Sequence, residues 1–251
     1  KYEKELYRKC DIRVTVGELL AQSMSRYFDC PFGTIYSCLS KSDEQKGGVE
    51  RDRLFWSREL GLPEQARIAV FQGSLTSLRN LDNLARSTKY LKENQYLVVI
   101  GGGHYEEEFK KIVQKEGNPE RVIYTGWVPQ ESLIVYTREA DLGILPYRSI
   151  NAYYAQSVPN KFLEYFNANI PIICDETLSE VASIIIKFNV GLTTDCSDPC
   201  QLGTTMSRVL NNEELLEQYR KNYDRHGSYL AYHSQKEKLL DYLKEFLSLV
   251  S

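Results

Sequence analysis

Residues 156–174, QSVPNKFLEYFNANIPIIC, decide the fold because they join an amphipathic helix directly to an apolar strand. Helical spacing places Asn160, Lys161 and Glu164 on a polar face, opposite a face of aromatic and aliphatic side chains. The run IPIIC at 170–174 is apolar throughout, which is typical of a parallel strand covered on both faces. The stretch therefore predicts a buried parallel sheet with a polar helix face at its edge.

Similar apolar runs, bounded by glycine or proline and followed by helical patterns, recur from residue 67 onward. They are RIAVFQG at 67–73, QYLVVIGGG at 95–103, RVIYTG at 121–126, ADLGILPY at 140–147 and IPIIC at 170–174. Repeated βα units of this kind predict a Rossmann-like α/β domain with a doubly wound parallel sheet. Ligands of such sheets bind at the loops that follow the strands.

The sequence divides into three parts. Residues 1–46 have the pattern helix, strand, helix, strand, which is too little for an independent core, and the polar stretch at 40–48 is predicted to be a linker. We therefore expect a larger two-domain protein, with the Rossmann-like domain at 47–233. Residues 234–251 predict a helix whose apolar stripe packs against a protein surface. The stripe consists of Leu239, Leu240, Leu243, Phe246, Leu247 and Val250.

Composition excludes several classes of protein. With 251 residues and a formal net charge of -3, the chain lacks the basic footprint of a general nucleic-acid binder. No apolar run approaches the roughly 20 residues of a membrane-spanning helix, and no secretory signal pattern opens the chain. We therefore expect a cytoplasmic protein.

The cysteines form no C-x-x-C pair and have no histidine spaced as a metal ligand beside them. They are Cys10, Cys30, Cys38, Cys174, Cys196 and Cys200. The scattered spacing favours reduced thiols and predicts no zinc site.

A phosphate site is predicted in the loop QGSLTSLRN at 72–80. Gly73 and Ser74 bring backbone N–H groups close to an anion, and Arg79, expected at the start of the next helix, adds a charge-assisted contact. Lys161 offers a second cation near the start of its own helix. The alternative is a turn glycine beside a solvated arginine.

Glu164 lies one turn beyond Lys161 and is the predicted ribose ligand. A carboxylate accepts two hydrogen bonds from a vicinal diol, each worth about 1.5 to 3 kcal/mol. The alternative is a Lys161–Glu164 surface pair, worth about 0.2 to 0.5 kcal/mol. Ser157 is predicted to cap this helix, with Pro159 in its first turn.

Two further loops are candidates for the base. The loop GGGHYEEE at 101–108 allows close backbone approach, but Glu106 replaces the third glycine of a G-x-G-x-x-G fingerprint. We expect a flat base to lie against Gly102 and the backbone of Trp127 and Val128. The Trp127 side chain itself is expected to be a partly buried aromatic.

Taken in order, these motifs resemble the carboxy-terminal, donor-binding half of GT-B glycosyltransferases. The resemblance is to the family-4-like (group 1) retaining enzymes of bacterial polysaccharide synthesis, and it spans nearly the whole chain. The matching stretches are CDIRVTVGELLAQSM at 10–24, VFQGSLTSLRNLDNL at 70–84, LVVIGGGHYEEEFKK at 97–111, RVIYTGWVPQESL at 121–133, ADLGILPY at 140–147 and SVPNKFLEYFNANIPII at 157–173.

The resemblance implies roles for individual residues. Glu164 takes the place of the family's ribose-binding glutamate, and Arg79 that of its phosphate-binding lysine. Ser74 stands where many members carry a partner arginine, so diphosphate binding is expected to rest on Arg79 and Lys161.

The resemblance also implies a sugar site in the loop before the helix of Glu164. Many members carry a glutamate eight residues before the ribose ligand, where this chain has Gln156. An amide still donates to and accepts from sugar hydroxyls. The other polar candidates for contact with the sugar are Tyr147, Asn151, Tyr154 and Asn160.

By this resemblance the protein transfers a sugar from a nucleoside diphosphate, UDP in preference to GDP, to a growing glycan or lipid-linked acceptor. The resemblance also implies that the protein works at the inner face of a bacterial plasma membrane. Whether the full-length protein associates peripherally with that membrane is left open. No cofactor is implied, and because no Asp-x-Asp pair occurs, no metal is expected. The catalytic residues are expected largely in an amino-terminal domain missing from this chain, so the chain alone binds donor and transfers poorly.

Two alternatives remain open. The departures at Ser74 and Gln156 suit a nucleotide-sugar-binding module that has lost transfer. A sugar-nucleotide epimerase shares the two-domain architecture. A dinucleotide-binding dehydrogenase is disfavoured because the fingerprint fails at Glu106.

Overall fold

The computed structural model describes residues 2–38 and 51–250. Its centre is a six-stranded, wholly parallel sheet with the strand order β5-β4-β3-β6-β7-β8. The strands are β3 (Arg67–Gln72), β4 (Gln95–Ile100), β5 (Val122–Gly126), β6 (Leu142–Leu145), β7 (Ile172–Asp175) and β8 (Gly191–Thr194). This doubly wound order confirms the predicted fold class. The chain adds strands in one direction from β3 to β5 and in the other from β6 to β8, so the switch point lies between β3 and β6. Sheets of this kind bind ligands at that point.

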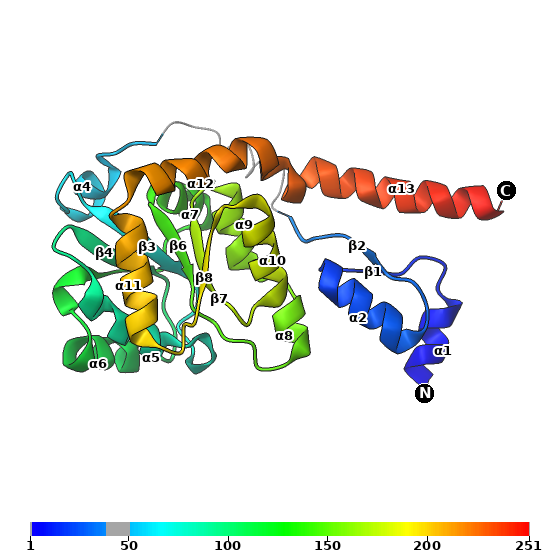
Figure 1. Ribbon diagram of the computed structural model, residues 1–251, viewed down its shortest axis with the longest axis horizontal. Helices are drawn as coiled ribbons and strands as arrows, with labels where there is room; N and C mark the ends of the chain where they lie inside the picture. The colour runs from blue at the N-terminus through cyan, green and yellow to red at the C-terminus, as the bar shows by residue number, and fades with distance from the viewer. Residues whose placement is uncertain (1, 39–50, 251) are drawn as a thin grey trace.

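The core lies on both faces of the sheet because its strands alternate their side chains. Ile68 and Val70 of β3 belong to one buried cluster, whereas Ala69 and Phe71 belong to the other. Helices cover both faces (Figure 1). The first cluster includes residues of α4 (Phe55–Leu60), α7 (Gln130–Glu139), α9 (Asn160–Asn167), α10 (Ser179–Phe188) and α12 (Glu213–His226). The second includes residues of α5 (Leu81–Ser87), α6 (Glu106–Glu116), α11 (Pro199–Leu210) and α12.

The sequence did not predict every element. The strand β8 was missed because GLTT lacks the apolar run that marked the other five strands. The loop predicted before α9 contains a short helix, α8 (Ala152–Gln156). The predicted linker at 40–48 falls largely outside the described residues, so the domain boundary at 46/47 stays a prediction.

The amino-terminal residues form a small unit beside this domain. It consists of α1 (Tyr2–Lys9), β1 (Val14–Thr15), α2 (Glu18–Phe28) and β2 (Gly33–Thr34). The strands were predicted at 11–16 and 33–39 but are only two residues long, and they pair in parallel.

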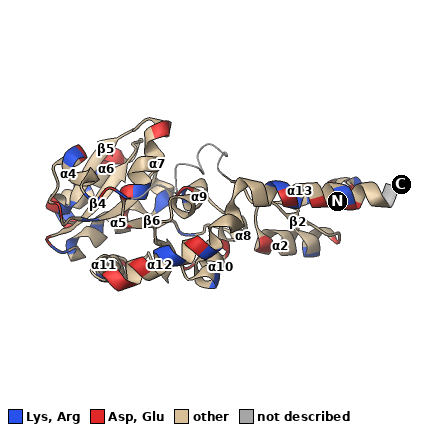
Figure 2. Cartoon of the chain, turned by 90° about the horizontal axis from the view of Figure 1, so that it is seen from above, with Lys and Arg blue, Asp and Glu red and all other residues tan. Residues whose placement is uncertain are grey.

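The carboxy-terminal helix α13 (Tyr232–Val250) extends from the Rossmann-like domain alongside this unit (Figure 1). The hydroxyl of Tyr242 accepts a hydrogen bond from the Thr34 N–H at 3.1 Å. The predicted apolar stripe is largely uncovered in the described structure. Its exposed members are Leu239, Leu240, Leu243 and Leu247, with exposed fractions of 40 to 63%. Figure 2 shows acidic and basic residues interspersed along α13.

A buried carboxylate joins the amino-terminal unit to the domain. Glu180, in the first turn of α10, accepts hydrogen bonds from the N–H groups of Glu18 and Leu19 at 2.7 and 2.8 Å. It also accepts the Tyr36 hydroxyl at 2.5 Å. Burial, and then the hydrogen bond to Glu180, raises the pKa of Tyr36 well above its usual value. Tyr36 therefore stays protonated and continues to donate.

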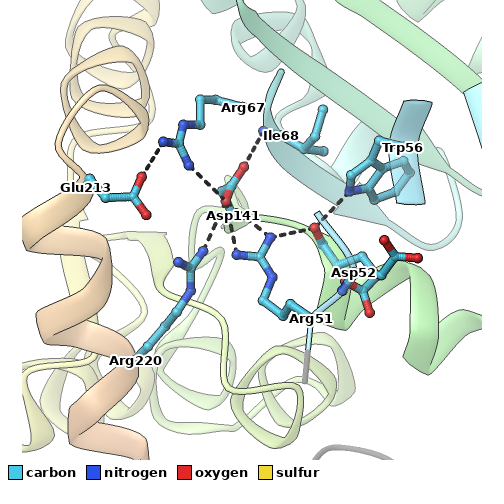
Figure 3. Close-up of polar contacts among 9 residues, drawn as sticks. Arg51, Asp52, Trp56, Arg67, Ile68, Asp141, Glu213 and Arg220 are labelled. Carbon is cyan, nitrogen blue, oxygen red and sulfur yellow. Dashed lines mark hydrogen bonds and ion pairs between the residues drawn. The ribbon is translucent and has the colours of Figure 1, made fainter. Parts of the chain in front are cut away.

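A second carboxylate lies among arginines near the amino-terminal ends of β3 and β6 (Figure 3). Asp141 accepts hydrogen bonds from both terminal nitrogens of Arg51 at 3.2 Å and from Arg220 at 3.0 Å. Its other oxygen, Oδ2, accepts the Ile68 N–H at 2.9 Å. Nη1 of Arg67 lies 3.8 Å from Oδ1. Because ligand loops follow the opposite strand ends, we assign this cluster to the structural connection between β3, β6 and α12.

Replacing Glu180 by alanine should destabilise the protein. The variant leaves the Tyr36 hydroxyl and two N–H groups of α2 without their acceptor, so the free energy of unfolding should fall by about 2 to 3 kcal/mol in urea denaturation. Glu217→Ala is the control, because Glu217 is exposed and lies 3.9 Å from Lys221, and it should change that free energy by less than about 0.5 kcal/mol. Equal free energies of unfolding for the two variants would contradict the role of Glu180.

Candidate functional site

A pocket of about 570 Å³ lies at the carboxyl ends of the central strands. This volume is in the ordinary range for small-molecule sites. The lining residues come from the loops after β3, β5, β6 and β7 and from the start of α9. They are Gly73, Ser74, Thr76, Leu78, Arg79, Trp127, Tyr147, Arg148, Ile150, Tyr153, Tyr154, Ser157, Pro159, Asn160, Lys161 and Leu178.

Tyr165 of α9 separates β3 from β6 just below this pocket. The two strands pair only at Ala69–Leu142 and Val70–Gly143. Where this pairing ends, the buried Tyr165 hydroxyl accepts the Gln72 N–H at 3.2 Å and donates to the Val70 carbonyl at 3.2 Å. Burial raises the pKa of Tyr165 well above its usual value, so the hydroxyl serves as both donor and acceptor. The strands can therefore diverge without leaving these backbone groups unpaired.

The absence of a side chain at Gly143 makes room for this ring. A Cβ atom at Gly143 would lie 2.6 Å from the Tyr165 ring. Sequence analysis assigned no role to Tyr165, because its function depends on the register of strands that are distant in sequence.

The loops after β3, β4 and β5 are held together by their backbones. The Leu75 N–H donates to the Gly102 carbonyl at 3.0 Å, and the Gly101 N–H donates to the Gly126 carbonyl at 2.8 Å. A Cβ atom at Gly101 would lie 2.2 Å from the Gly73 carbonyl oxygen, so only glycine permits this approach. The floor of the site is thus backbone in a fixed arrangement.

The two predicted phosphate cations meet beside Gly73, whose φ is +120°. A Cβ atom there would lie 2.8 Å from Cε of Lys161 and 3.4 Å from Nη1 of Arg79. Arg79 ends the 3-10 helix η1 (Ser77–Arg79), so the prediction that it starts the next helix was wrong in this detail. The structure nonetheless brings Gly73, Ser74, Arg79 and Lys161 together in one pocket.

Tyr147 orients Arg79. Nη1 of Arg79 donates to the Tyr147 hydroxyl at 2.9 Å, and its guanidinium lies 4.9 Å from the centre of that ring. Burial raises the pKa of Tyr147 to about 12, although the nearby Arg79 opposes this shift. The hydroxyl is therefore neutral at physiological pH and holds the arginine without neutralising its charge.

Glu164 does not itself line the pocket, but it contacts a residue that does. Both of its oxygens lie 2.9 Å from Nζ of Lys161, and Oε2 accepts a hydrogen bond from Nε2 of Gln72. The expected Lys161–Glu164 pair is present, but it is not a surface pair, because the side chains are only 19% and 14% exposed. Thr137 fixes Gln72 by donating to its Oε1 at 2.7 Å. Sequence analysis missed Gln72, although a glutamine ending an apolar strand is a usable signal.

The prediction that Ser157 caps α9 was wrong. Pro159 occupies the N-cap position and provides no side-chain hydrogen bond, while Ser157 ends α8. Asn151 caps α8, because its side chain accepts the Tyr154 N–H at 3.0 Å. Asn151 is therefore engaged in the helix cap and does not line the pocket, whereas Tyr154 does.

The other predicted residues are divided between the pocket and its surroundings. Tyr147, Asn160 and Trp127 line the pocket, and Trp127 is 67% exposed rather than partly buried. The residues Gly102, Val128 and Gln156 do not line it. A Cβ atom at Gly102 would lie 3.1 Å from the Trp127 ring nitrogen, Val128 packs on the core, and the Gln156 carbonyl borders Gly17 of the amino-terminal unit.

Four lining residues after β6 and β7 were not singled out from the sequence, although three of them lie in the loop expected to line the sugar site. They are Arg148, Ile150, Tyr153 and Leu178. A cation directly after a predicted strand was the available signal for Arg148.

No group of three metal-ligating side chains occurs in the described part of the chain, so the expected metal independence stays a prediction. Among the described helices, none is both long and apolar enough to span a membrane. A further hollow of about 670 Å³ lies between α2, β2 and α13, away from the loops that follow the central strands.

Replacing Tyr165 by phenylalanine should remove the hydroxyl that separates β3 from β6. The buried Gln72 N–H then has no partner, so the free energy of unfolding should fall by about 1 to 3 kcal/mol in urea denaturation. Tyr27→Phe, at a tyrosine 63% exposed, is the control and should have no measurable effect. Unchanged stability of Tyr165→Phe would show that the strands diverge without help from this hydroxyl.

Comparison with known proteins places this architecture in a family. Residues 52–226 match the model of the "Glycosyl transferases group 1" family. A Bacillus subtilis (strain 168) protein, TuaC, whose name places it in teichuronic acid biosynthesis, is 26% identical over 146 residues. That match covers 58% of this chain but only 32% of TuaC.

Solved structures share the fold. Sucrose-phosphate synthase from Thermosynechococcus elongatus matches 98% of this chain and 61% of its own, with a TM-score of 0.79 and 16% identity. A mutant of S. aureus TarM, solved with UDP, matches 96% of this chain and 45% of its own, with a TM-score of 0.72 and 12% identity. The predicted GT-B fold is thereby confirmed. The chain belongs to the group 1 family of glycosyl transferases.

Proposed function

We propose that this chain is the donor-binding part of a retaining, metal-independent glycosyltransferase that moves a sugar from a nucleoside diphosphate to a growing glycan. One observation carries the proposal. Arg79 and Lys161 converge beside the backbone of Gly73 at the switch point of a doubly wound sheet, with Glu164 next to Lys161. This arrangement suits a diphosphate attached to a ribose.

The two cations supply what the transfer reaction needs. As the bond between sugar and phosphate breaks, the sugar gains oxocarbenium character and negative charge grows on the leaving diphosphate. Preorganised positive groups stabilise that charge most in the transition state. Arg79, held by Tyr147, and Lys161 would act here together with the backbone N–H of Ser74.

Glu164 would exchange partners when the donor binds. In the structure it accepts hydrogen bonds from Lys161 and Gln72. A bound diphosphate would attract Lys161, which leaves the carboxylate to accept the two ribose hydroxyls. The base would lie near Trp127 and the backbone at 126–128. The UDP in the TarM structure supports UDP in preference to GDP.

The partners follow from the family. We infer a glycan or lipid-linked acceptor and a second domain that carries most of the catalytic residues. This inference agrees with the 32% of TuaC that the chain matches. Action at the cytoplasmic face of a bacterial membrane belongs to the same proposal, and no nucleic-acid partner is proposed.

A module without transfer activity is the second candidate, because Ser74 and Gln156 depart from the family pattern. A full-length protein that binds a nucleotide sugar but never releases nucleoside diphosphate, with any acceptor, would favour it. Isomerised sugar nucleotide without an acceptor would instead indicate an epimerase.

Calorimetric titration of this chain tests the ribose assignment. Wild type should bind UDP more tightly than GDP or UMP, and Glu164→Ala should weaken UDP binding by about tenfold, since one lost charged hydrogen bond is worth at least that. The variant should not weaken the already weaker binding of 2′,3′-dideoxy-UDP, because the loss of Glu164 leaves Lys161 free for the diphosphate.

The control for this titration is Glu217→Ala, which removes an exposed carboxylate of α12 and should leave all affinities unchanged. Equal weakening of UDP and dideoxy-UDP by Glu164→Ala would contradict the ribose assignment. If neither nucleoside diphosphate binds the folded chain, the proposed donor site is wrong.

A further inference from the structure

We propose that the sugar carried by the donor is acidic, of the hexuronic acid class, and that Arg148 binds its carboxylate. The inference rests on the proposed function and deepens it, because it concerns the sugar end of the same pocket. It is carried by the position of Arg148, the charges that line the pocket and the anchoring of the guanidinium.

The strand order fixes which part of a donor each loop meets. Trp127 follows β5 at one edge of the sheet, Gly73 follows β3 at the switch point, and Arg148 follows β6 beyond it. With the base near Trp127 and the diphosphate at Gly73, the sugar extends toward the ends of β6 and β7. Arg148 lines that end of the pocket.

The charged side chains that line the pocket are all cationic. The described residues that line the pocket include three cations, Arg79, Arg148 and Lys161, and no carboxylate. The segment 147–161, which runs from the end of β6 to α9, contains no aspartate or glutamate. Since Arg79 and Lys161 match the diphosphate, Arg148 is a third cation that the nucleotide does not use.

Arg148 forms an ion pair with a buried carboxylate at the end of a neighbouring strand. Its Nε lies 3.8 Å from Oδ2 of Asp175, which ends β7. Asp175 is itself fixed by the N–H groups of Thr177 and Cys196, at 3.0 and 2.9 Å. The ion pair engages only Nε, and the two terminal nitrogens have no polar partner among the described residues. A guanidinium held in this way offers a bidentate site for a carboxylate.

Arg148 is also accessible to a ligand, since its side chain is 46% exposed. Neutral sugars are recognised by hydrogen bonds to hydroxyls, for which side-chain amides and carboxylates suffice. An acidic sugar gains from a guanidinium and would be repelled by an unpaired carboxylate in the pocket lining, where none of the described residues supplies one. The uncharged segment around Gln156 fits the acidic sugar.

The test compares UDP-glucuronic acid with UDP-glucose by calorimetric titration of this chain, with UDP as the reference. Wild type should bind UDP-glucuronic acid at least about tenfold more tightly than UDP-glucose, the effect of one good charged contact. Arg148→Gln should abolish that preference while leaving the affinity for UDP within about twofold. Arg148→Lys should restore part of the preference, because it keeps the charge without the planar fork.

The control is Arg208→Gln, which removes an exposed arginine of α11 that does not line this pocket. It should leave the preference intact. Equal binding of the two sugar nucleotides by wild type, or equal weakening of both and of UDP by Arg148→Gln, overturns the proposal while the donor site stands.

The base that the site prefers decides which pair of sugar nucleotides is compared, and the expected results are the same for either pair. If GDP binds and UDP does not, GDP-mannuronic acid and GDP-mannose replace the uridine pair with the same expectations. Failure of both UDP and GDP to bind contradicts the proposed function itself.

Discussion

The hydroxyl of Tyr165 is the contact on which the pocket depends. A parallel sheet that continued to pair β3 with β6 would leave no opening at the switch point, because each backbone group would bond to the next strand. Where the pairing ends, Tyr165 accepts the Gln72 N–H at 3.2 Å and donates to the Val70 carbonyl at 3.2 Å. The strands separate at this point without unpaired groups. The same residue fixes α9, which presents Lys161 to the pocket with Glu164 beside it.

Electrostatic exchange links this geometry to ligand binding. Without a ligand, Glu164 neutralises Lys161 and is held by Gln72, so a partly buried cation is compensated. An anionic ligand can replace Glu164 as the partner of Lys161, and the released carboxylate can accept hydroxyl groups. The positive charge of Lys161 is thus compensated by an ion pair that a diphosphate can rearrange. Such an exchange requires a lysine and a glutamate on one face of α9.

The sequence allowed the general fold and much of the pocket to be predicted. Continuous apolar runs indicated β3 to β7, and the rule that parallel strands share one carboxyl edge brought Gly73, Arg79 and Lys161 together. The strand β8 was missed because its four residues, GLTT, carry no such run. Tyr165 could not be assigned, because its role depends on strand register and on Gln72, which is distant in sequence. Arg148 was overlooked although it directly follows a predicted strand.

A crystal structure of this chain with bound UDP tests the central claim most directly. We expect the diphosphate within hydrogen-bonding distance of Arg79 and Lys161, and the ribose hydroxyls on Glu164. The Lys161–Glu164 ion pair should be broken and the uracil should lie beside Trp127. A nucleotide bound elsewhere, such as in the hollow between α2 and α13, would contradict the account. So would a nucleotide that sits in the pocket with its base on the β7 side of the switch point.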